Sequence, residues 1–378
     1  MSASASDALL GLIVRPSAVR LWSMTGTERA RRILTKAGAE IVTADQAALG
    51  TKVLLTRADW VVDQALVGLV REHLGRVLIT GDDAHAVVLA AYIEGQDVAA
   101  VVASVENGSP LPGGLEVIHF DPTQPLYLKT LRKKLKPVAL ALTPESVRAA
   151  ERATFAGSYK GVTDVVTKYW WPLPARIVVR WCAALSITPN MVTLFGFILV
   201  LLAPWWFVRG WFWMGLAGAW VMTFLDTVDG KLARCTLNYS KFGDIFDHGI
   251  DLISPPFWWW AWHAGALAVG ANYPWADLCL AITFGGYIVL RLQEGLFISR
   301  FGMHIHVWRR FDSFFRLIVA RRNPILILLT VSLICGEPGW GMVATAAWTA
   351  ISIVVHAIQT VQAWWAKRHG PLVSWMAQ

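Results

Sequence analysis

The chain of 378 residues contains few charged side chains, because Asp, Glu, Lys and Arg together make up only 16% of it. Its four cysteines are scattered and form no CxxC pair, so neither a disulfide framework nor a cysteine zinc site is indicated. The N-terminus lacks the long apolar core of a secretory signal peptide, which predicts that the chain starts in the cytosol. No basic run carries a nucleic-acid motif, and we therefore expect no nucleic-acid partner.

Apolar and aromatic residues, in contrast, are abundant. Hydrophobic residues account for 55% of the sequence, the mean hydropathy is +0.47, and there are 21 tryptophans. Together these values indicate an integral membrane protein. The formal net charge of +8 suits contact with anionic lipid headgroups and with phosphate-bearing substrates.

The first part of the chain, residues 1–140, has the pattern of a soluble domain. Short apolar runs alternate with amphipathic helical stretches, and none reaches the roughly 20 apolar residues that a membrane span needs. This alternation predicts an α/β domain of the Rossmann type with a mainly parallel sheet. Residues 141–187 read as a connector, with a helix expected to start at the N-cap Thr143, followed by an amphipathic helix on the membrane surface. The basic run 129–136 is expected to lie near anionic lipid.

Residues 188–378 predict an α-helical membrane domain. About six spans are expected, at 192–208, 211–230, 243–267, 275–296, 312–335 and 340–365. On one side, the loops 208–211, 268–276 and 336–340 contain Arg209 as their only basic residue. Positive charge marks the cytosolic side, so both termini are expected in the cytosol and the protein in the cell (inner) membrane. Tryptophans near the span ends, including the run 258–260, are interpreted as an interfacial belt.

Four carboxylates lie at helical spacings at one end of these apolar segments. Asp226 and Asp229 are three residues apart, and Asp247 and Asp251 are four apart, so each pair shares one helix face. Ionisable groups in such a place are costly and usually functional. Hard divalent cations prefer carboxylate oxygens, and two such ions form a known clamp for phosphoryl chemistry. The sequence therefore predicts a Mg²⁺ or Mn²⁺ site with two metal ions.

The full pattern is D-x2-D-G-x2-A-R-x8-G-x3-D-x3-D, running from Asp226 to Asp251. It resembles the complete signature of the CDP-alcohol phosphotransferase family, which is also called the CDP-alcohol phosphatidyltransferase family. The resemblance implies transfer of a phosphatidyl or phospho-alcohol group from a CDP-linked donor to an alcohol acceptor in phospholipid biosynthesis, with release of CMP. It further implies that the four carboxylates hold the metals and that Asp251 takes the acceptor proton. The residues implied at the CDP site are Gly230, Ala233, Arg234 and Gly243.

Two further groups of residues lie outside the signature. The TPN-x-x-T element with Asn190 and Thr193 is similar to the one that enters the first span near the nucleotide in this family. Arg316, Arg321 and Arg322 fall within the fifth expected span, where an arginine usually faces a polar cavity. They are candidates for binding an anionic acceptor, and snorkelling to lipid headgroups is the alternative.

The layout of the whole chain is similar to that of the bifunctional inositol-phosphate cytidylyltransferase and di-inositol-phosphate phosphate synthase enzymes. Pro16, Ser17 and Ala18 stand where the nucleotidyltransferase family carries its glycine-rich nucleotide loop. Asp59 is the candidate for that family's metal-binding acid. We therefore expect a degenerate, inactive N-terminal domain, with an active cytidylyltransferase as the alternative.

Other functions remain open from the sequence alone. A divalent-cation transporter is a competing class, although its acids would be spread over several spans rather than gathered at one place. The expected partners are the CDP-linked donor, the alcohol acceptor and membrane lipids, and a homodimer is left open. The donor and the acceptor are not identified by the residues.

Overall fold

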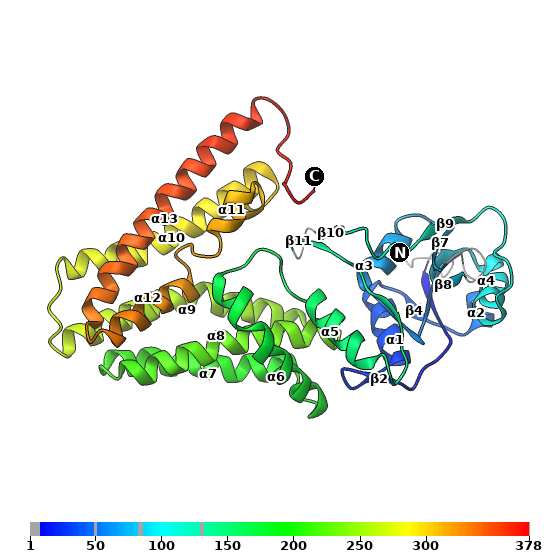
Figure 1. The fold of residues 1–378 in the computed structure, drawn as a ribbon, viewed down its shortest axis with the longest axis horizontal. Coiled ribbons are helices and arrows are strands. Elements are labelled where there is room, and N and C mark those ends of the chain that lie inside the picture. The colour runs from blue at the N-terminus through cyan, green and yellow to red at the C-terminus, as the bar shows by residue number, and fades with distance from the viewer. Residues whose placement is uncertain (1–7, 49–50, 82–85, 129–131, 378) are drawn as a thin grey trace, which may run out of the picture.

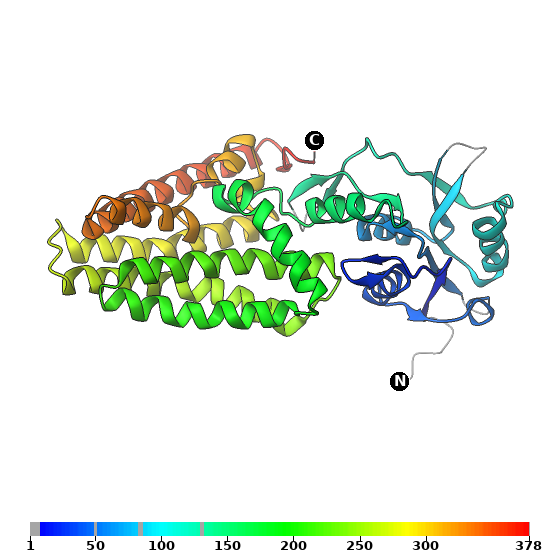
Figure 2. The same cartoon turned by 60° about the horizontal axis from the view of Figure 1, so that its bottom comes forward.

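The structure, a computed structural model, describes residues 8–48, 51–81, 86–128 and 132–377. An α/β domain at the N-terminal end lies beside a long helical bundle, and the connector runs between the two (Figures 1 and 2). Of the basic run 129–136, residues 129–131 lie outside the described residues. The mostly helical architecture with an N-terminal α/β region agrees with the expectation from sequence.

The α/β domain is built on a six-stranded sheet in the order β4-β1-β5-β8-β7-β9. Five strands run parallel to one another, and β8 is antiparallel to both of its neighbours. The sheet is therefore mainly parallel, as expected, with one reversed strand that the apolar pattern did not reveal. The strands are β1 (Leu9–Val14), β4 (Glu40–Ile41), β5 (Lys52–Arg57), β7 (Arg76–Thr80), β8 (Val87–Ile93) and β9 (Glu116–His119).

Helices cover the sheet and smaller strand pairs extend from it. Amphipathic α1 buries Ile33 and Leu34, and its N-cap Thr25 accepts a hydrogen bond from the backbone of Glu28. The helices are α1 (Gly26–Lys36), α2 (Ala44–Ala47), α3 (Gln64–Arg71) and α4 (Gly95–Asn107). The strand pairs are β2 (Arg20–Leu21) with β3 (Met24–Thr25), β6 (Trp60–Val62) with β12 (Ala139–Ala141), and β10 (Leu126–Leu128) with β11 (Lys133–Leu135).

The connector helix α5 (Val147–Gly157) begins later than the sequence indicated. Its N-cap is Ser146, so the expected start at Thr143 is wrong. The hydroxyl of Ser146 donates to the carbonyl of Ala141, and Thr143 and Ser146 bond each other's backbone amides, which forms a turn ahead of the helix. The expected amphipathic segment follows as the π-helix η2 (Val166–Trp170) and α6 (Pro172–Ala184), which meet at Trp171. Large apolar side chains of α6, such as Trp181, are exposed as an interfacial helix requires.

The bundle is formed by long helices that run along its length (Figure 2). Helix α7 packs against α8 and α9, and α10 packs against α13. The elements are α7 (Pro189–Val208), α8 (Phe212–Cys235), α9 (Lys241–Ala268), α10 (Ala276–Phe301), η3 (Ile305–Val307), α11 (Arg310–Phe315), α12 (Arg322–Ile334) and α13 (Pro338–Lys367). By length and apolar composition, α7, α10 and α13 are long enough to cross a membrane. The fifth expected span is divided into α11 and the shorter apolar α12.

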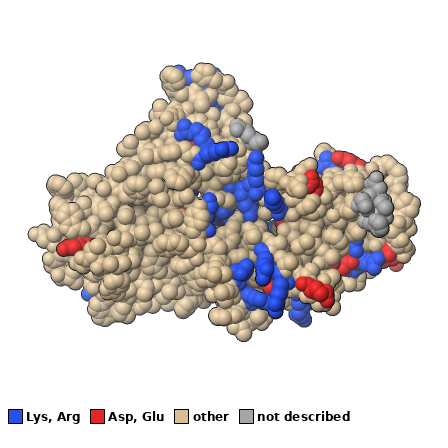
Figure 3. Space-filling model, in the orientation of Figure 1, with Lys and Arg blue, Asp and Glu red and all other residues tan. Residues whose placement is uncertain are grey.

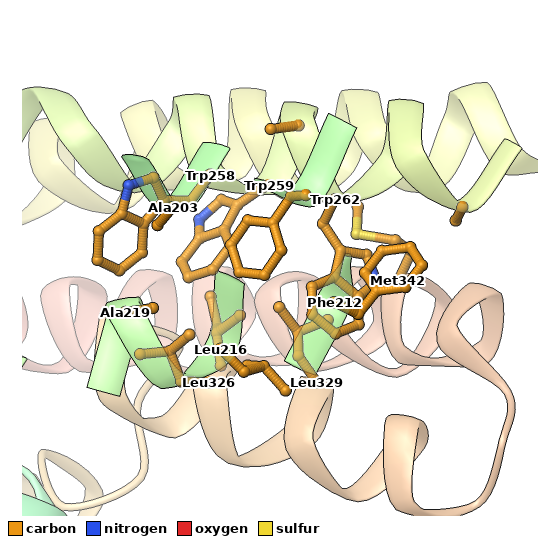
Figure 4. Close-up of a cluster of buried hydrophobic side chains, with 14 of the residues drawn as sticks. Ala203, Phe212, Leu216, Ala219, Trp258, Trp259, Trp262, Leu326, Leu329 and Met342 are labelled. Atoms are coloured by element: carbon orange, nitrogen blue, oxygen red, sulfur yellow. The ribbon is translucent and has the colours of Figure 1, made fainter. Parts of the chain in front are cut away.

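Tryptophans form the centre of the bundle (Figure 4). Trp258, Trp259 and Trp262 are fully buried, and only Trp260 of the run 258–260 is exposed. The indole N–H of Trp258 donates to the carbonyl of Val200, and that of Trp262 donates to the carbonyl of Pro338. The expectation of an interfacial belt is therefore wrong for Trp258 and Trp259, because both rings pack inside the bundle. A carbonyl satisfies the indole N–H of Trp258, whereas that of Trp259 is buried without a partner.

The two parts of the molecule share an apolar core. Trp22 of the N-terminal domain, Phe155 of α5, and Val228 and Leu232 of α8 belong to one buried cluster. Polar contacts add to it, since Arg32 donates to the carbonyl of Thr236 at 2.8 Å. The α/β domain is therefore fixed against the end of α8 that carries the acidic signature.

Candidate active site

Helices α8 and α9 bring the signature carboxylates together. Asp226 and Asp229 lie one turn apart near the C-terminal end of α8, and Asp247 and Asp251 lie one turn apart near the start of α9. The hydroxyl of Ser240 caps α9 by accepting from the backbone of Gly243, which fixes where its first turn begins. Oxygen atoms of Asp226, Asp229 and Asp247 lie within 4.8 Å of one another. This spacing suits carboxylates that share a divalent cation.

Asp229 is the most deeply placed of these acids. Its residue is 3% exposed, and the Thr193 hydroxyl on α7 donates to its Oδ2 at 2.6 Å. Its other oxygen, Oδ1, is buried and has no hydrogen-bond partner. A buried carboxylate oxygen without a partner is costly unless a cation binds it, so Asp229 fits a metal ligand. Thr193 thus contacts one oxygen of Asp229 and leaves the other, Oδ1, without a partner.

Arg322 at the start of α12 is the cation that faces these acids. Its guanidinium donates to Asp226 at 2.6 Å and to Asp251 at 2.5 Å. The start of α12 is anchored by the next residue, Asn323, whose amide donates to the buried carboxylate of Asp164. Arg322 therefore lies against the acidic cluster, whereas the sequence had grouped it with Arg316 and Arg321.

The small residues of the signature lie where side chains approach closely. A Cβ atom on Gly243 would collide with the side-chain oxygen of Asn190, so the start of α7 and the start of α9 meet at this glycine. A Cβ atom on Gly230 would lie 2.9 Å from a guanidinium nitrogen of Arg234, which shows that Arg234 folds back over α8. Ala233 is half-buried on the same helix. Gly230, Arg234 and Gly243 thus lie on the two helices that carry the acids, and Asn190 contacts the first turn of α9.

A second polar group lies on α10 and the segment after it. The carboxylate of Glu294 pairs with Arg321 and, at 3.1 Å each, with Arg291 and the Nε2 atom of His306. Glu294, His306 and His356 also have ligand atoms within 4.8 Å of one another. Two guanidinium groups already neutralise Glu294, and a further cation there would be repelled. We therefore interpret this group as an ion-pair network.

Arg316 lies beside this network with unsatisfied donors. Its residue is 8% exposed, and its Nε and Nη1 atoms have no hydrogen-bond partner. The Nε atom of Arg321 is likewise buried and without a partner. Arg316 and Arg321 thus both carry buried guanidinium nitrogens that no described side chain or backbone group satisfies.

Sequence reasoning missed Glu294, Asp164 and Asn323. Glu294 carried a usable signal, because a carboxylate inside an apolar helix of 26 residues is unusual. Asp164 and Asn323 are far apart in the chain and become partners only in the fold. No local pattern could have paired them.

The helical part of the chain is similar to known proteins. Residues 186–366 match the family model described as CDP-alcohol phosphatidyltransferase. Over 117 residues the chain is 35% identical to an archaetidylinositol phosphate synthase of Pyrococcus horikoshii, and the match covers 31% of this chain and 58% of that protein.

Eukaryotic proteins are also similar to this chain. Cholinephosphotransferase 1 of Gallus gallus is 25% identical over 219 residues, which are 53% of this chain and 58% of that protein. Cholinephosphotransferase 1 of Homo sapiens is 26% identical over 153 residues, which are 36% and 33% of the two chains. The chain thus spans just over half the length of the first two relatives.

Proposed function

Because residues 186–366 belong to the CDP-alcohol phosphatidyltransferase family, we propose that this protein transfers a phosphatidyl or phospho-alcohol group from a CDP-linked donor to an alcohol, releasing CMP. The relatives are transferases of phosphorus-containing groups, which supports this reaction type. The observation that carries the proposal is the meeting of Asp226, Asp229 and Asp247 within 4.8 Å beside an unpartnered buried oxygen of Asp229.

The acidic cluster fits a divalent cation. Asp226, Asp229 and Asp247 would hold Mg²⁺ or Mn²⁺, with Asp251 completing the set, and the ions would stabilise negative charge on the diphosphate and on departing CMP. The donor diphosphate would lie against Gly230 and Gly243, where the lack of side chains leaves room. Arg234, Ala233, Asn190 and Thr193 border the same place.

Asp251 is proposed as the base. Its side chain keeps 39% exposure, so an acceptor hydroxyl can reach it from the open side of the cluster. Asp251 takes the hydroxyl proton as the acceptor oxygen bonds to the β-phosphorus, and the bond from this phosphorus to the bridging oxygen breaks. The leaving CMP carries away the electron pair of that bond. Arg322 holds the carboxylate of Asp251 in place.

Arg316 and Arg321 are proposed to bind the acceptor. Their unpartnered guanidinium nitrogens favour an acceptor that carries its own negative charge, such as a phosphate. This choice agrees with the name of the archaetidylinositol phosphate synthase, which describes a product with an inositol phosphate group. An uncharged alcohol is the alternative, and it would leave these donors unsatisfied.

The membrane arrangement is also a proposal in part. Helices α8 and α9, with 24 and 28 residues, are long enough to cross the membrane alongside α7, α10 and α13. Together α11 and α12 would complete a sixth crossing. The basic residues near the acidic cluster favour a cytosolic orientation of the site in the cell membrane.

The N-terminal domain is proposed to have no cytidylyltransferase activity. Both carboxylate oxygens of Asp59 accept from the guanidinium of Arg57, at 2.6 and 2.7 Å. This bidentate pairing neutralises Asp59 and orients both of its oxygens toward Arg57, which weakens it as a metal ligand. A bifunctional enzyme would have to break this ion pair.

Lipid mass spectrometry tests the proposed reaction. Membranes of cells that express the protein should accumulate a phospholipid that cells expressing Asp226→Asn lack. The structure of that phospholipid identifies the donor and the acceptor from which it was made. The purified protein should release CMP when it is given both. An unchanged lipid profile, together with no CMP release from any CDP-linked donor, would contradict the proposal.

A further inference from the structure

The β10–β11 hairpin connects the N-terminal domain to the polar region around Glu294. Tyr127 of β10 packs against a buried cluster formed by Val162, Val307 and Met376. On β11, the ammonium group of Lys133 donates to the carbonyl of Gly157 at 2.6 Å, which ties the hairpin to the end of α5. The hairpin thus lies against the end of the bundle where α10 and η3 meet.

Gly161 fixes how close the hairpin comes. A Cβ atom at this position would lie 2.5 Å from the carbonyl oxygen of Arg132 and 3.0 Å from the Cα atom of Lys133. These are backbone atoms, so a side chain at residue 161 would force the hairpin away. Arg132 itself has φ +50°, a conformation that is uncommon for a residue with a side chain and is retained only where the surroundings impose it.

Positive charge gathers where the hairpin meets the bundle, and Figure 3 shows Lys and Arg side chains between the two parts of the molecule. Burial, and then the charge of Arg321, lower the pKa of Arg132, although Glu294 and Tyr127 act in the opposite direction. Burial, followed by the charges of Arg132, Arg321 and Lys160, lowers the pKa of His304 to about 4. These groups are therefore close enough to repel one another's protons.

The carboxylates near these cations are already engaged. The charges of Asp226 and Asp247 reach Lys160, but both acids belong to the proposed metal site. Glu294 is shared by Arg291 and Arg321, and Asp164 is used by Thr167 and Asn323. Within the described part of the chain, Arg132 and Lys160 have no hydrogen-bond or ion-pair partner. Half-buried cations without partners are costly, and an anion placed among them would remove that cost.

We propose that Arg132 and Lys160 complete a phosphate site with Arg316 and Arg321, so that the N-terminal domain supplies part of the acceptor pocket. The ligand is a phosphomonoester dianion carried by the acceptor. The identification of the ligand as the acceptor's phosphate rests on the proposed function, whereas phosphate binding itself can be measured without it. It gives the N-terminal domain a positioning role in the transfer reaction, in place of a reaction of its own.

Inorganic phosphate is the probe that tests the site directly. In lipid nanodiscs with EDTA, phosphate should raise the melting temperature of the wild type. Its binding should weaken about tenfold or more in Arg132→Gln, because a charge-assisted hydrogen bond to the phosphate is lost. Arg71→Gln, an exposed arginine on α3 of the same domain, is the matched control and should bind phosphate as the wild type does. Equal binding by Arg132→Gln and Arg71→Gln, or no binding by the wild type, would overturn the inference.

A second pair of variants moves the hairpin without changing its charge. Gly161→Val should weaken phosphate binding, whereas Gly157→Ala, whose added Cβ would lie 3.8 Å from Leu135, should not. In CMP-release assays with a phosphorylated acceptor, Arg132→Gln should raise the acceptor KM about tenfold and leave the donor KM unchanged. Phosphate binding without any CMP release would refute the proposed reaction and leave the site intact. Normal acceptor KM in Arg132→Gln would refute the site.

Discussion

Thr193→Val tests whether the hydroxyl behind Asp229 supports a metal site. The Thr193 hydroxyl lies 2.6 Å from Asp229 Oδ2 and 3.1 Å from the carbonyl oxygen of Pro189, and its single proton belongs on the nearer, charged oxygen. A hydrogen bond to a charged group contributes about 1.5–3 kcal/mol. Valine has the same shape without the donor, so the carboxylate loses that support while the packing of α7 on α8 is kept.

The expected result is a loss of metal affinity. At 1.4 kcal/mol for each factor of ten, the lost hydrogen bond corresponds to a Kd for Mn²⁺ that rises by about 10- to 100-fold, the range typical of residues that orient metal ligands. Calorimetric titration of Mn²⁺ into nanodisc-embedded protein would measure it. Thr227→Val is the matched control, because this buried threonine on α8 donates to the carbonyl of Thr223 at 3.4 Å. Unchanged affinity in Thr193→Val, or an equal loss in Thr227→Val, would refute the reasoning.

Two further variants test the proposed base Asp251 and the N-terminal residue Asp59. Asp251→Asn should lower kcat by about 10²-fold or more with little change in either KM, because a general base acts chiefly in the transition state. A CMP-release assay measures kcat and both KM values, and a change confined to KM would contradict that role. The full-length protein should release no pyrophosphate from CTP and a sugar or polyol phosphate, since Arg57 occupies both oxygens of Asp59; release that Asp59→Ala abolishes would contradict this expectation.

The sequence predicted those features that local spacing controls. The members of the two carboxylate pairs are three and four residues apart, so each pair had to share one helix face. The start of α7 at Thr188-Pro189 follows from the capping hydroxyl of Thr188 and the proline at the first helical position. The alternation of apolar runs likewise predicted the mainly parallel sheet.

Contacts between distant segments were beyond such reasoning. Trp258 and Trp259 are buried against side chains of other helices, and a carbonyl of α7 accepts from Trp258; a window of apolar residues does not reveal these contacts. The turn between α11 and α12 replaced an expected single helix, because Arg316 and Arg321 lie in a polar region that also receives Glu294 of α10. The placement of Arg322 on Asp226 and Asp251 depends on the same turn.

The claim that the acidic cluster performs metal-dependent transfer can be tested by one measurement. The purified protein is given the CDP-linked donor and acceptor found by lipid mass spectrometry, and CMP is measured with Mg²⁺, with Mn²⁺ and with EDTA. We predict CMP release with either metal, none in EDTA, and loss of most activity in Asp229→Asn, since an amide lacks the anionic oxygen that binds the ion. CMP release that continues unchanged in EDTA and in Asp229→Asn would contradict the account.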